Sequence, residues 1–178
     1  ETVVIKGSEV VTGWVKDGNV WRKDGWTKEL VQGFTKGCRL VSPNVMEVFQ
    51  RDGVRDEAVV LLRVRTPEEL REGKCYWDEK TGTITIWPYA ATGADGLFDP
   101  NASGVEVPVR GWGMSLTGRF ARVRGLQFRQ FGMAAVTNWS SVGLAGKDCV
   151  IEDCLVTWAD FVRMSFSGFR NVLRRCEA

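Results

Sequence analysis

Three segments of the chain share one pattern of hydrophobic and polar positions. They are residues 117–128, 145–156 and 167–178. The segments align without a gap on Gly118, Gly146 and Gly168, at offsets of 28 and 22 residues. Apolar side chains alternate with polar ones in each copy, which is the period of a β-strand. Recurrence at this spacing is typical of a stacked, repeating architecture.

The aligned positions form columns that separate core from surface. Small or apolar residues occupy four columns, Ala121/Cys149/Asn171, Val123/Ile151/Leu173, Leu126/Cys154/Cys176 and Phe128/Val156/Ala178. Between them Arg124, Glu152 and Arg174 should point outward. If the copies stack about 4.8 Å apart, this column alternates plus, minus, plus and forms a favourable cross-strand ladder.

The alternation of apolar and polar positions shifts by one residue at Gly125, Asp153 and Arg175. One residue in the left-handed region turns the chain there, which suits Gly and Asp but not Arg. Strand, one-residue corner, strand and loop together predict one coil of a parallel β-helix. The alternative is chance similarity among short strands of an ordinary β-sandwich. Residues 3–10 align with 121–128, with Gly7 at the corner, and predict a first coil that an inserted domain separates from the others.

The middle of the chain has a different pattern. Asp17-Gly18 suits a type I′ turn and predicts a hairpin in which Trp14 faces Trp21. Thr66 and Pro67 predict the start of a short helix. Three further strands are expected at residues 75–77, 83–87 and 105–109.

The composition limits which partners and catalytic groups we expect. The net charge is +2, and both signs are mixed along the chain, so we expect no nucleic-acid partner and no membrane surface. The chain has no His, which removes His-based triads and general bases. The spacing of the five Cys residues fits no metal site, and no cofactor is expected. Cys38 and Cys75 could pair, because both lie in the inserted region.

Several segments resemble, in the same order, segments of bacterial proteins of the pectate-lyase-like superfamily. They are residues 3–14, 48–53, 69–78, 82–87 and 123–129. The resemblance implies an all-β fold, a right-handed parallel β-helix whose first coils are interrupted by a small antiparallel β domain containing a short helix. The expected organisation is a first coil over 1–11, an inserted domain over 12–110 and further coils over 111–178.

The resemblance also implies carbohydrate chemistry. Relatives in the family include polysaccharide lyases and glycoside hydrolases, usually secreted, periplasmic or at the cell surface. Their sites lie in a groove along one parallel sheet. Here residues 134–139, aligned with 160–165, form the candidate strands. The predicted substrate-binding residues are Thr137, Trp139 and Arg163, and the candidates for catalysis are Asp160 and Arg163.

The third copy of the repeat is interrupted at Ala178, which leaves an open strand edge. We therefore expect the N-terminal part of a longer carbohydrate-active protein, with its catalytic coils beyond this residue and a polysaccharide or oligosaccharide partner. The alternatives are a non-catalytic glycan-binding module and an assembly module that self-associates through the open end of the β-helix.

Overall fold

The computed structural model describes residues 3–27, 47–51, 58–89, 98–110, 113–131, 142–159 and 164–178. These residues divide into two compact units. The first holds the described residues up to Ser8 and from Pro108 onward, and the second holds those from Glu9 to Val107. None of the described helices has the length and hydropathy of a membrane-spanning segment.

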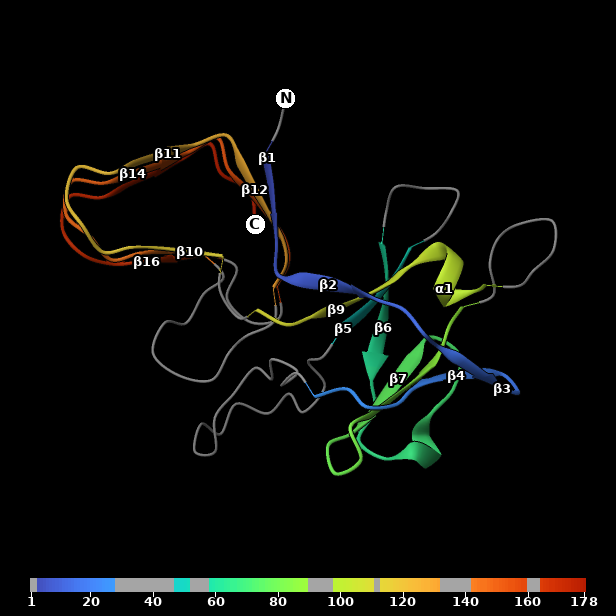
Figure 1. Cartoon of the computed structure of the whole chain (residues 1–178). Helices are drawn as coiled ribbons and strands as arrows, with labels where there is room; N and C mark the ends of the chain where they lie inside the picture. Colours follow the sequence, from blue (N-terminus) through green and yellow to red (C-terminus); the bar gives the residue numbers. More distant parts are fainter. Residues whose placement is uncertain are drawn as a thin grey trace. The chain divides into compact units, whose positions relative to one another are not determined.

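The first unit consists of three parallel sheets of three strands each (Figure 1). One sheet contains β1 (Val3–Lys6), β12 (Leu126–Phe131) and β15 (Leu155–Ala159). The second contains β10 (Met114–Leu116), β13 (Val142–Leu144) and β16 (Met164–Phe166). The third contains β11 (Arg122–Arg124), β14 (Val150–Glu152) and β17 (Val172–Arg174).

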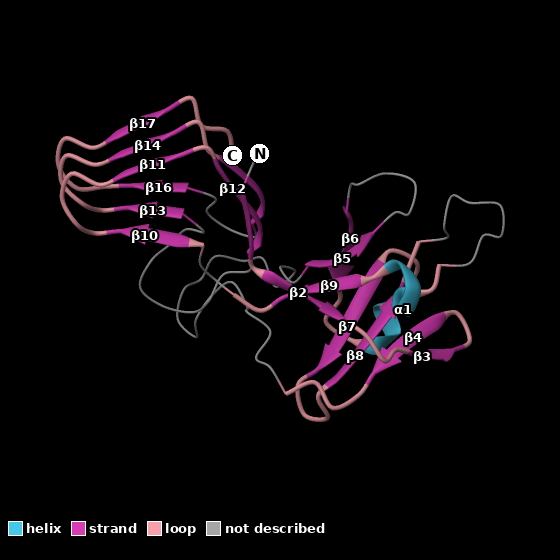
Figure 2. Ribbon diagram, turned by 45° about the horizontal axis from the view of Figure 1, so that its top comes forward, coloured by secondary structure: helices cyan, strands magenta, loops and turns pink. Residues whose placement is uncertain are grey.

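Successive coils contribute one strand to each sheet. The chain runs from β10 through β11 to β12, and then repeats the same order from β13 to β15, as Figure 2 shows. All described pairings between coils are parallel. The predicted fold class, an all-β fold with parallel β-helix coils, is confirmed.

The repeat columns have the predicted register. Val123 pairs with Ile151 and Ile151 with Leu173, while Arg124, Glu152 and Arg174 pair in the neighbouring column. Inward side chains of the coils form one buried core, whose fully enclosed members are Phe128, Phe131, Leu144, Cys149, Ile151, Cys154 and Val156. The apolar columns are therefore the interior of the β-helix, where burial removes them from water.

Two bends of each coil, those on either side of the third sheet, use left-handed backbone. Gly125, Asp153 and Arg175 have φ of 71°, 54° and 49°, so the predicted one-residue corner is confirmed, including its Arg member. A second left-handed column, which the sequence did not predict, holds Phe120, Asp148 and Arg170 at φ of 61°, 58° and 53°.

The predicted register of the first coil is wrong by five residues. Val3 pairs with Leu126 and Ile5 with Phe128, so β1 joins the sheet of β12. Gly7 is therefore not a corner residue. A Cβ at this position would lie 2.5 Å from Phe131 Cδ1 and 2.7 Å from Gln130 O, so close approach of the next coil requires the glycine. A short alternating strand fits more than one of the three strands of a coil, and the pattern alone does not distinguish them.

The second unit is built on an eight-stranded sheet in the order β2-β9-β5-β6-β7-β8-β4-β3. Its strands are β2 (Ser8–Val11), β3 (Val15–Asp17), β4 (Val20–Lys23), β5 (Glu47–Arg51), β6 (Ala58–Arg63), β7 (Lys74–Asp78), β8 (Thr83–Trp87) and β9 (Val105–Pro108). The β6–β7 pair is parallel, and the pairs β3–β4, β4–β8, β5–β6, β5–β9 and β7–β8 are antiparallel. Residues 9–11, which the sequence placed in the first coil, belong to β2 of this sheet.

Short helices and an apolar core complete the second unit. A 3₁₀ turn η1 (Pro67–Glu69) connects β6 to β7, and α1 (Pro100–Ser103) precedes β9. The helix start predicted at Thr66 is present, but its side chain makes no cap hydrogen bond. Buried residues of this unit form a separate core, Val11, Trp14, Leu61, Cys75, Trp77, Ile84, Ile86, Phe98, Val105 and Val107.

The predicted hairpin exists in a different register. Lys16, not Trp14, lies opposite Trp21, and Gly18 has φ of 59° in the two-residue turn that ends before β4. Glycine at the first turn position is typical of a type II′ turn. Trp14 instead is buried in the core, where its Nε1 donates to Val11 O at 2.9 Å. The ring of Trp14 is thus buried in the core and does not form the predicted cross-strand pair with Trp21.

Candidate functional site

The site residues predicted from the sequence lie outside the described residues. They are Thr137, Trp139, Asp160 and Arg163. Their roles in substrate binding and catalysis therefore stay predictions. Cys38 also lies outside the described residues, so its pairing with Cys75 stays open.

The strand alignment on which that site rested is wrong. It placed Ser165 beside Trp139, whereas in the structure Ser165 pairs with Gly143. The offset between these two residues is 22, the same as between Gly146 and Gly168. The same offset of 22 residues therefore relates the second coil to the third both in this strand and in the turn that follows it. The strand beside β16 is therefore β13.

The described strands of the sheet β10-β13-β16 carry few groups that could take part in catalysis. Its described strands read Met-Ser-Leu, Val-Gly-Leu and Met-Ser-Phe, without an ionisable residue. Met114, Leu116 and Met164 pack against the core, and Ser115 is exposed. Acid–base chemistry at this sheet would have to come from residues outside these strands.

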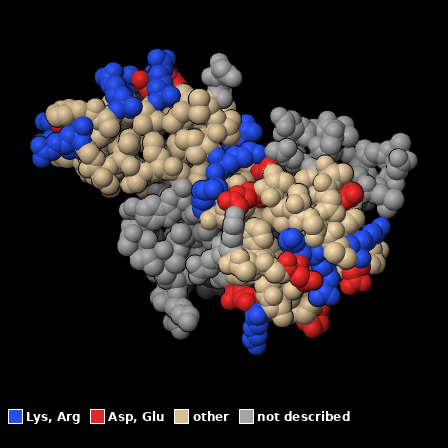
Figure 3. All heavy atoms as spheres, viewed as in Figure 1, with Lys and Arg blue, Asp and Glu red and all other residues tan. Residues whose placement is uncertain are grey.

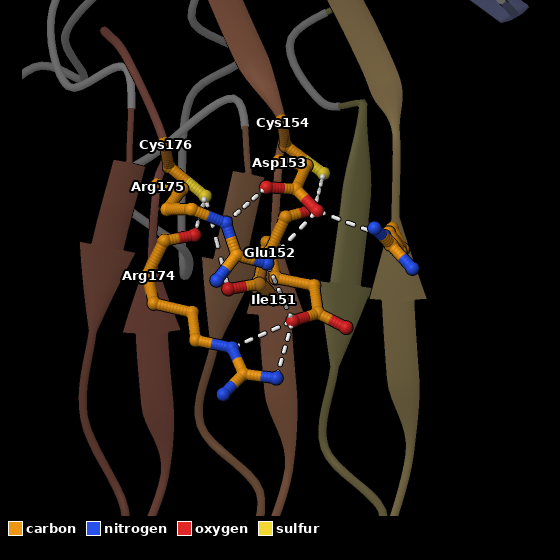
Figure 4. Close-up of polar contacts among 8 residues, drawn as sticks. Ile151, Glu152, Asp153, Cys154, Arg174, Arg175 and Cys176 are labelled. Carbon is orange, nitrogen blue, oxygen red and sulfur yellow. Dashed lines mark hydrogen bonds and ion pairs between the residues drawn. The ribbon is translucent and has the colours of Figure 1, made fainter.

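Charged residues instead gather where the third sheet turns the corner (Figure 4). Asp153 accepts hydrogen bonds from Arg124 Nε at 2.8 Å and from Arg175 Nε at 2.5 Å. Glu152 Oε2 accepts from Arg174 Nε at 2.6 Å and from Arg175 Nη2 at 3.2 Å. The predicted ladder is confirmed between Glu152 and Arg174, but Arg124 bonds to the corner carboxylate instead. We refer to these five residues as the corner network.

Arginine partners keep the carboxylates of the coils ionised. The hydrogen bond from Arg175 lowers the pKa of Asp153 to about 2. Arg174 lowers the pKa of Glu152, and Arg170 lowers that of Asp148, again chiefly through hydrogen bonds. A general acid needs a raised pKa to hold its proton at neutral pH. These three groups are thus suited to binding cations and not to donating protons.

The turn that joins the second sheet to the third is held by backbone hydrogen bonds between coils. Lys147 N donates to Gly118 O at 3.0 Å, and Phe169 N donates to Gly146 O at 3.2 Å. One residue further on, Phe120 N donates to Lys147 O at 3.1 Å. Asn171 also donates from Nδ2 to Gly146 O at 2.6 Å. The backbone of this turn therefore fixes where its side chains project.

Two exposed aromatic rings and several charges project from this turn. We define the turn cluster as Arg119, Phe120, Lys147, Asp148, Phe169 and Arg170. Phe120 is 73% exposed and Phe169 59% exposed. Lys147 Nζ lies 5.5 Å from the centroid of the Phe169 ring, and Arg170 Cζ lies 5.1 Å from it. Figure 3 shows basic side chains at the end of the coils where the chain passes from the second sheet to the third.

A carboxylate orients one cation of the turn cluster. Asp148 accepts from Arg170 Nε at 2.5 Å and from Nη2 at 2.7 Å, a two-point contact that fixes the guanidinium plane. Sequence reasoning missed this cluster. The available signal was that Phe120 and Phe169 fall in columns whose other members are charged, Asp148 and Arg170 for the first and Arg119 and Lys147 for the second.

The described residues form no metal centre. Among them, no group of three or more Cys, Asp or Glu side chains is arranged to hold an ion. The described coils present arginine-paired carboxylates at the corner, and cations beside two exposed aromatic rings at the turn.

Comparison with known proteins agrees with an all-β fold built around parallel coils. No family model matches the sequence, and no curated protein matches it either. Among solved structures, the chain is similar to XylC in complex with xylose, at 23% identity and a TM-score of 0.50. The match covers 88% of this chain and 30% of the XylC chain, so this chain spans less than a third of that protein. At this identity the likeness shows the fold.

Proposed function

We propose that this chain supplies the first coils of a carbohydrate-active β-helix protein and contacts the sugar polymer. The observation that carries the proposal is the stack of parallel coils, whose fold is similar to that of a structure solved with xylose bound. Proteins of this architecture present long, regular surfaces, which suit an extended polymer.

Binding is the part of this function that the described chemistry supports. The carboxylates at the corners and turns are ionised and paired with arginine, and the whole chain has no His. Sugar recognition needs polar partners and a flat apolar ring, because a pyranose has hydroxyl edges and an apolar C–H face. We propose Thr137, Trp139 and Arg163 as such a set, with Asp160 and Arg163 as candidates for catalysis in the whole protein.

In the whole protein we propose a polysaccharide lyase or glycoside hydrolase that is secreted, periplasmic or at the cell surface. A polymeric substrate is the reason for this location, since it stays outside the cell. The two reactions differ in product. A lyase forms an ultraviolet-absorbing unsaturated sugar, whereas a hydrolase forms new reducing ends without that absorbance.

Calorimetric titration of the chain with neutral and uronate-containing oligosaccharides tests the binding function. We expect binding that weakens in Trp139→Ala and Arg163→Ala and that is unchanged in Arg71→Ala, which removes an exposed charge from the second unit. Absence of binding to every saccharide would refute the proposal. For the whole protein, absence of both unsaturated products and new reducing ends would refute the enzymatic part.

A further inference from the structure

We propose that the turn cluster is a second saccharide-binding surface and that its ligand is an acidic polysaccharide. This inference rests on the proposed function and adds a ligand class and a set of residues. The residues of this surface are distinct from Thr137, Trp139, Asp160 and Arg163.

The backbone does not explain why position 120 is a phenylalanine. Phe120 has φ of 61°, and a bulky residue in the left-handed region costs about 1–2 kcal/mol. The equivalent residue of the next coil is Asp148, a residue type that tolerates this conformation well. Asp, Asn or Gly would therefore form the same turn at lower cost.

Packing does not explain the phenylalanine either. Its side chain is 73% exposed, so folding removes little of its ring from water. Phe169, two coils away from Phe120, is 59% exposed on the same turn. A single exposed apolar residue needs no explanation. Two aromatic rings on equivalent stacked turns, one of them in a disfavoured conformation, point to a partner outside the chain.

The charges around the rings indicate the sign of that partner. The turn cluster contains three cations, Arg119, Lys147 and Arg170, and one carboxylate, Asp148. Formal charges sum to 3 − 1 = +2. Asp148 is paired with Arg170, so the net positive charge comes from Arg119 and from Lys147, whose Nζ lies over the Phe169 ring. This charge attracts an acidic ligand.

The combination of rings and cations favours a sugar acid over other anions. The C–H face of a pyranose stacks on an aromatic ring and leaves water, while its carboxylate pairs with Lys or Arg. The two rings lie two coils apart along the stack, on the order of 10 Å, which suits several linked sugars. Because coil-to-coil hydrogen bonds already fix the turn, little conformational entropy is lost when a ligand binds.

The test is calorimetric titration of the full chain with three probes: an oligogalacturonate, a neutral xylo-oligosaccharide and a single-stranded DNA of matched charge. We expect the oligogalacturonate to bind most tightly, and its affinity to fall between about 0.1 M and about 1 M salt. Phe120→Asn and Phe169→Ala should each weaken it by about fivefold, and Lys147→Ala by about threefold. Arg122→Ala, which removes an exposed charge from β11, is the matched control and should leave it unchanged.

Phe120→Leu provides a second variant that keeps apolar bulk but removes the ring, and it should weaken binding as Phe120→Asn does. Oligogalacturonate binding that is unchanged in all the turn variants would overturn the inference. Tighter binding of the DNA would overturn it too, because the surface would then be a general polyanion site. Neutral binding that depends on Trp139, with no effect of the turn variants, would leave the proposed function standing without this inference. Absence of binding to either saccharide would remove both.

Discussion

Arg175 Nε donates a hydrogen bond of 2.5 Å to Asp153 Oδ1, and the two residues occupy the same left-handed corner of consecutive coils (Figure 4). Left-handed backbone disfavours arginine. The charge-assisted bonds of Arg175 to Asp153 and Glu152 offset that strain. The corner network therefore explains why the third coil tolerates a residue that its backbone alone would not select.

Replacing Asp153 with Asn should destabilise the chain at neutral pH. Asn tolerates left-handed backbone, so the variant removes the charge and leaves the corner conformation accessible. The pKa of Asp153 is about 2 in the folded chain, below its ordinary value of 3.8. Its ionised form thus contributes stability above pH 3.8, and that contribution is lost as the pH falls toward 2.

Urea denaturation across this pH range measures the effect. The midpoint of Asp153→Asn should lie below that of the unmodified chain at pH 7, and the difference should shrink as the pH falls from about 4 to about 2. A difference that stays constant down to pH 2 would show that the ion pairs do not stabilise the corner.

Gly146 and Gly118 occupy one column of the turn, but replacement by Ala should destabilise the chain only at Gly146. A Cβ on Gly146 would overlap Gly118 O and lie 2.9 Å from Cys149 Sγ, whereas no described atom lies within 4 Å of a Cβ on Gly118. We expect Gly146→Ala to lose about 1–3 kcal/mol of unfolding free energy through overpacking. Gly118→Ala should be neutral. Equal effects in chemical denaturation would contradict the stacking of these turns.

Asn171 ties the third coil to the second through its side chain. Its Nδ2 donates to Gly146 O and Ser167 O, both at 2.6 Å, and its Oδ1 accepts from Cys149 N at 3.0 Å. Asn171→Asp replaces the donor with a carboxylate facing two carbonyls, and we expect a loss of about 2 kcal/mol. Asn19→Asp, at the exposed hairpin turn, is the matched control and should change stability little. Equal thermal midpoints of the two variants would argue against this role.

The thiols of the coils should differ in reactivity. Cys149 and Cys154 are buried, and burial raises the pKa of the Cys154 thiol, which suppresses the reactive thiolate. Cys176, in the same column as Cys154, is half-buried. Iodoacetamide labelling followed by peptide mass spectrometry should therefore modify Cys176 first, and all three at similar rates in urea. Faster labelling of Cys154 in the folded chain would contradict its place in the core.

The sequence predicted the coil well because its repeat has a fixed spacing. Ile151 and Cys154 are buried where the alternation placed them, and Asp153 turns the corner between them. The same reasoning gave the wrong register for residues 3–10, since four alternating residues fit more than one strand of a coil. It also failed at Trp14, where burial in the core of the second unit decided the register of the hairpin.

The turn cluster was not predictable from alternation. Phe120 and Phe169 sit at turn positions, where side-chain direction follows from backbone φ and not from a period of two. Asn171 was predicted as a small core residue, and the structure shows it as a bridge between coils. Such roles depend on which carbonyl the next coil presents, and a single sequence does not contain that information.

The thermal midpoint of Phe120→Asn tests most directly the claim that the turn cluster serves a ligand and not the fold. Asn tolerates the left-handed backbone at φ of 61°, and the lost ring is 73% exposed. We predict that the midpoint rises, corresponding to a gain of about 1 kcal/mol in unfolding free energy. A lower midpoint would show that the Phe120 ring stabilises the folded coils, and it would contradict the account.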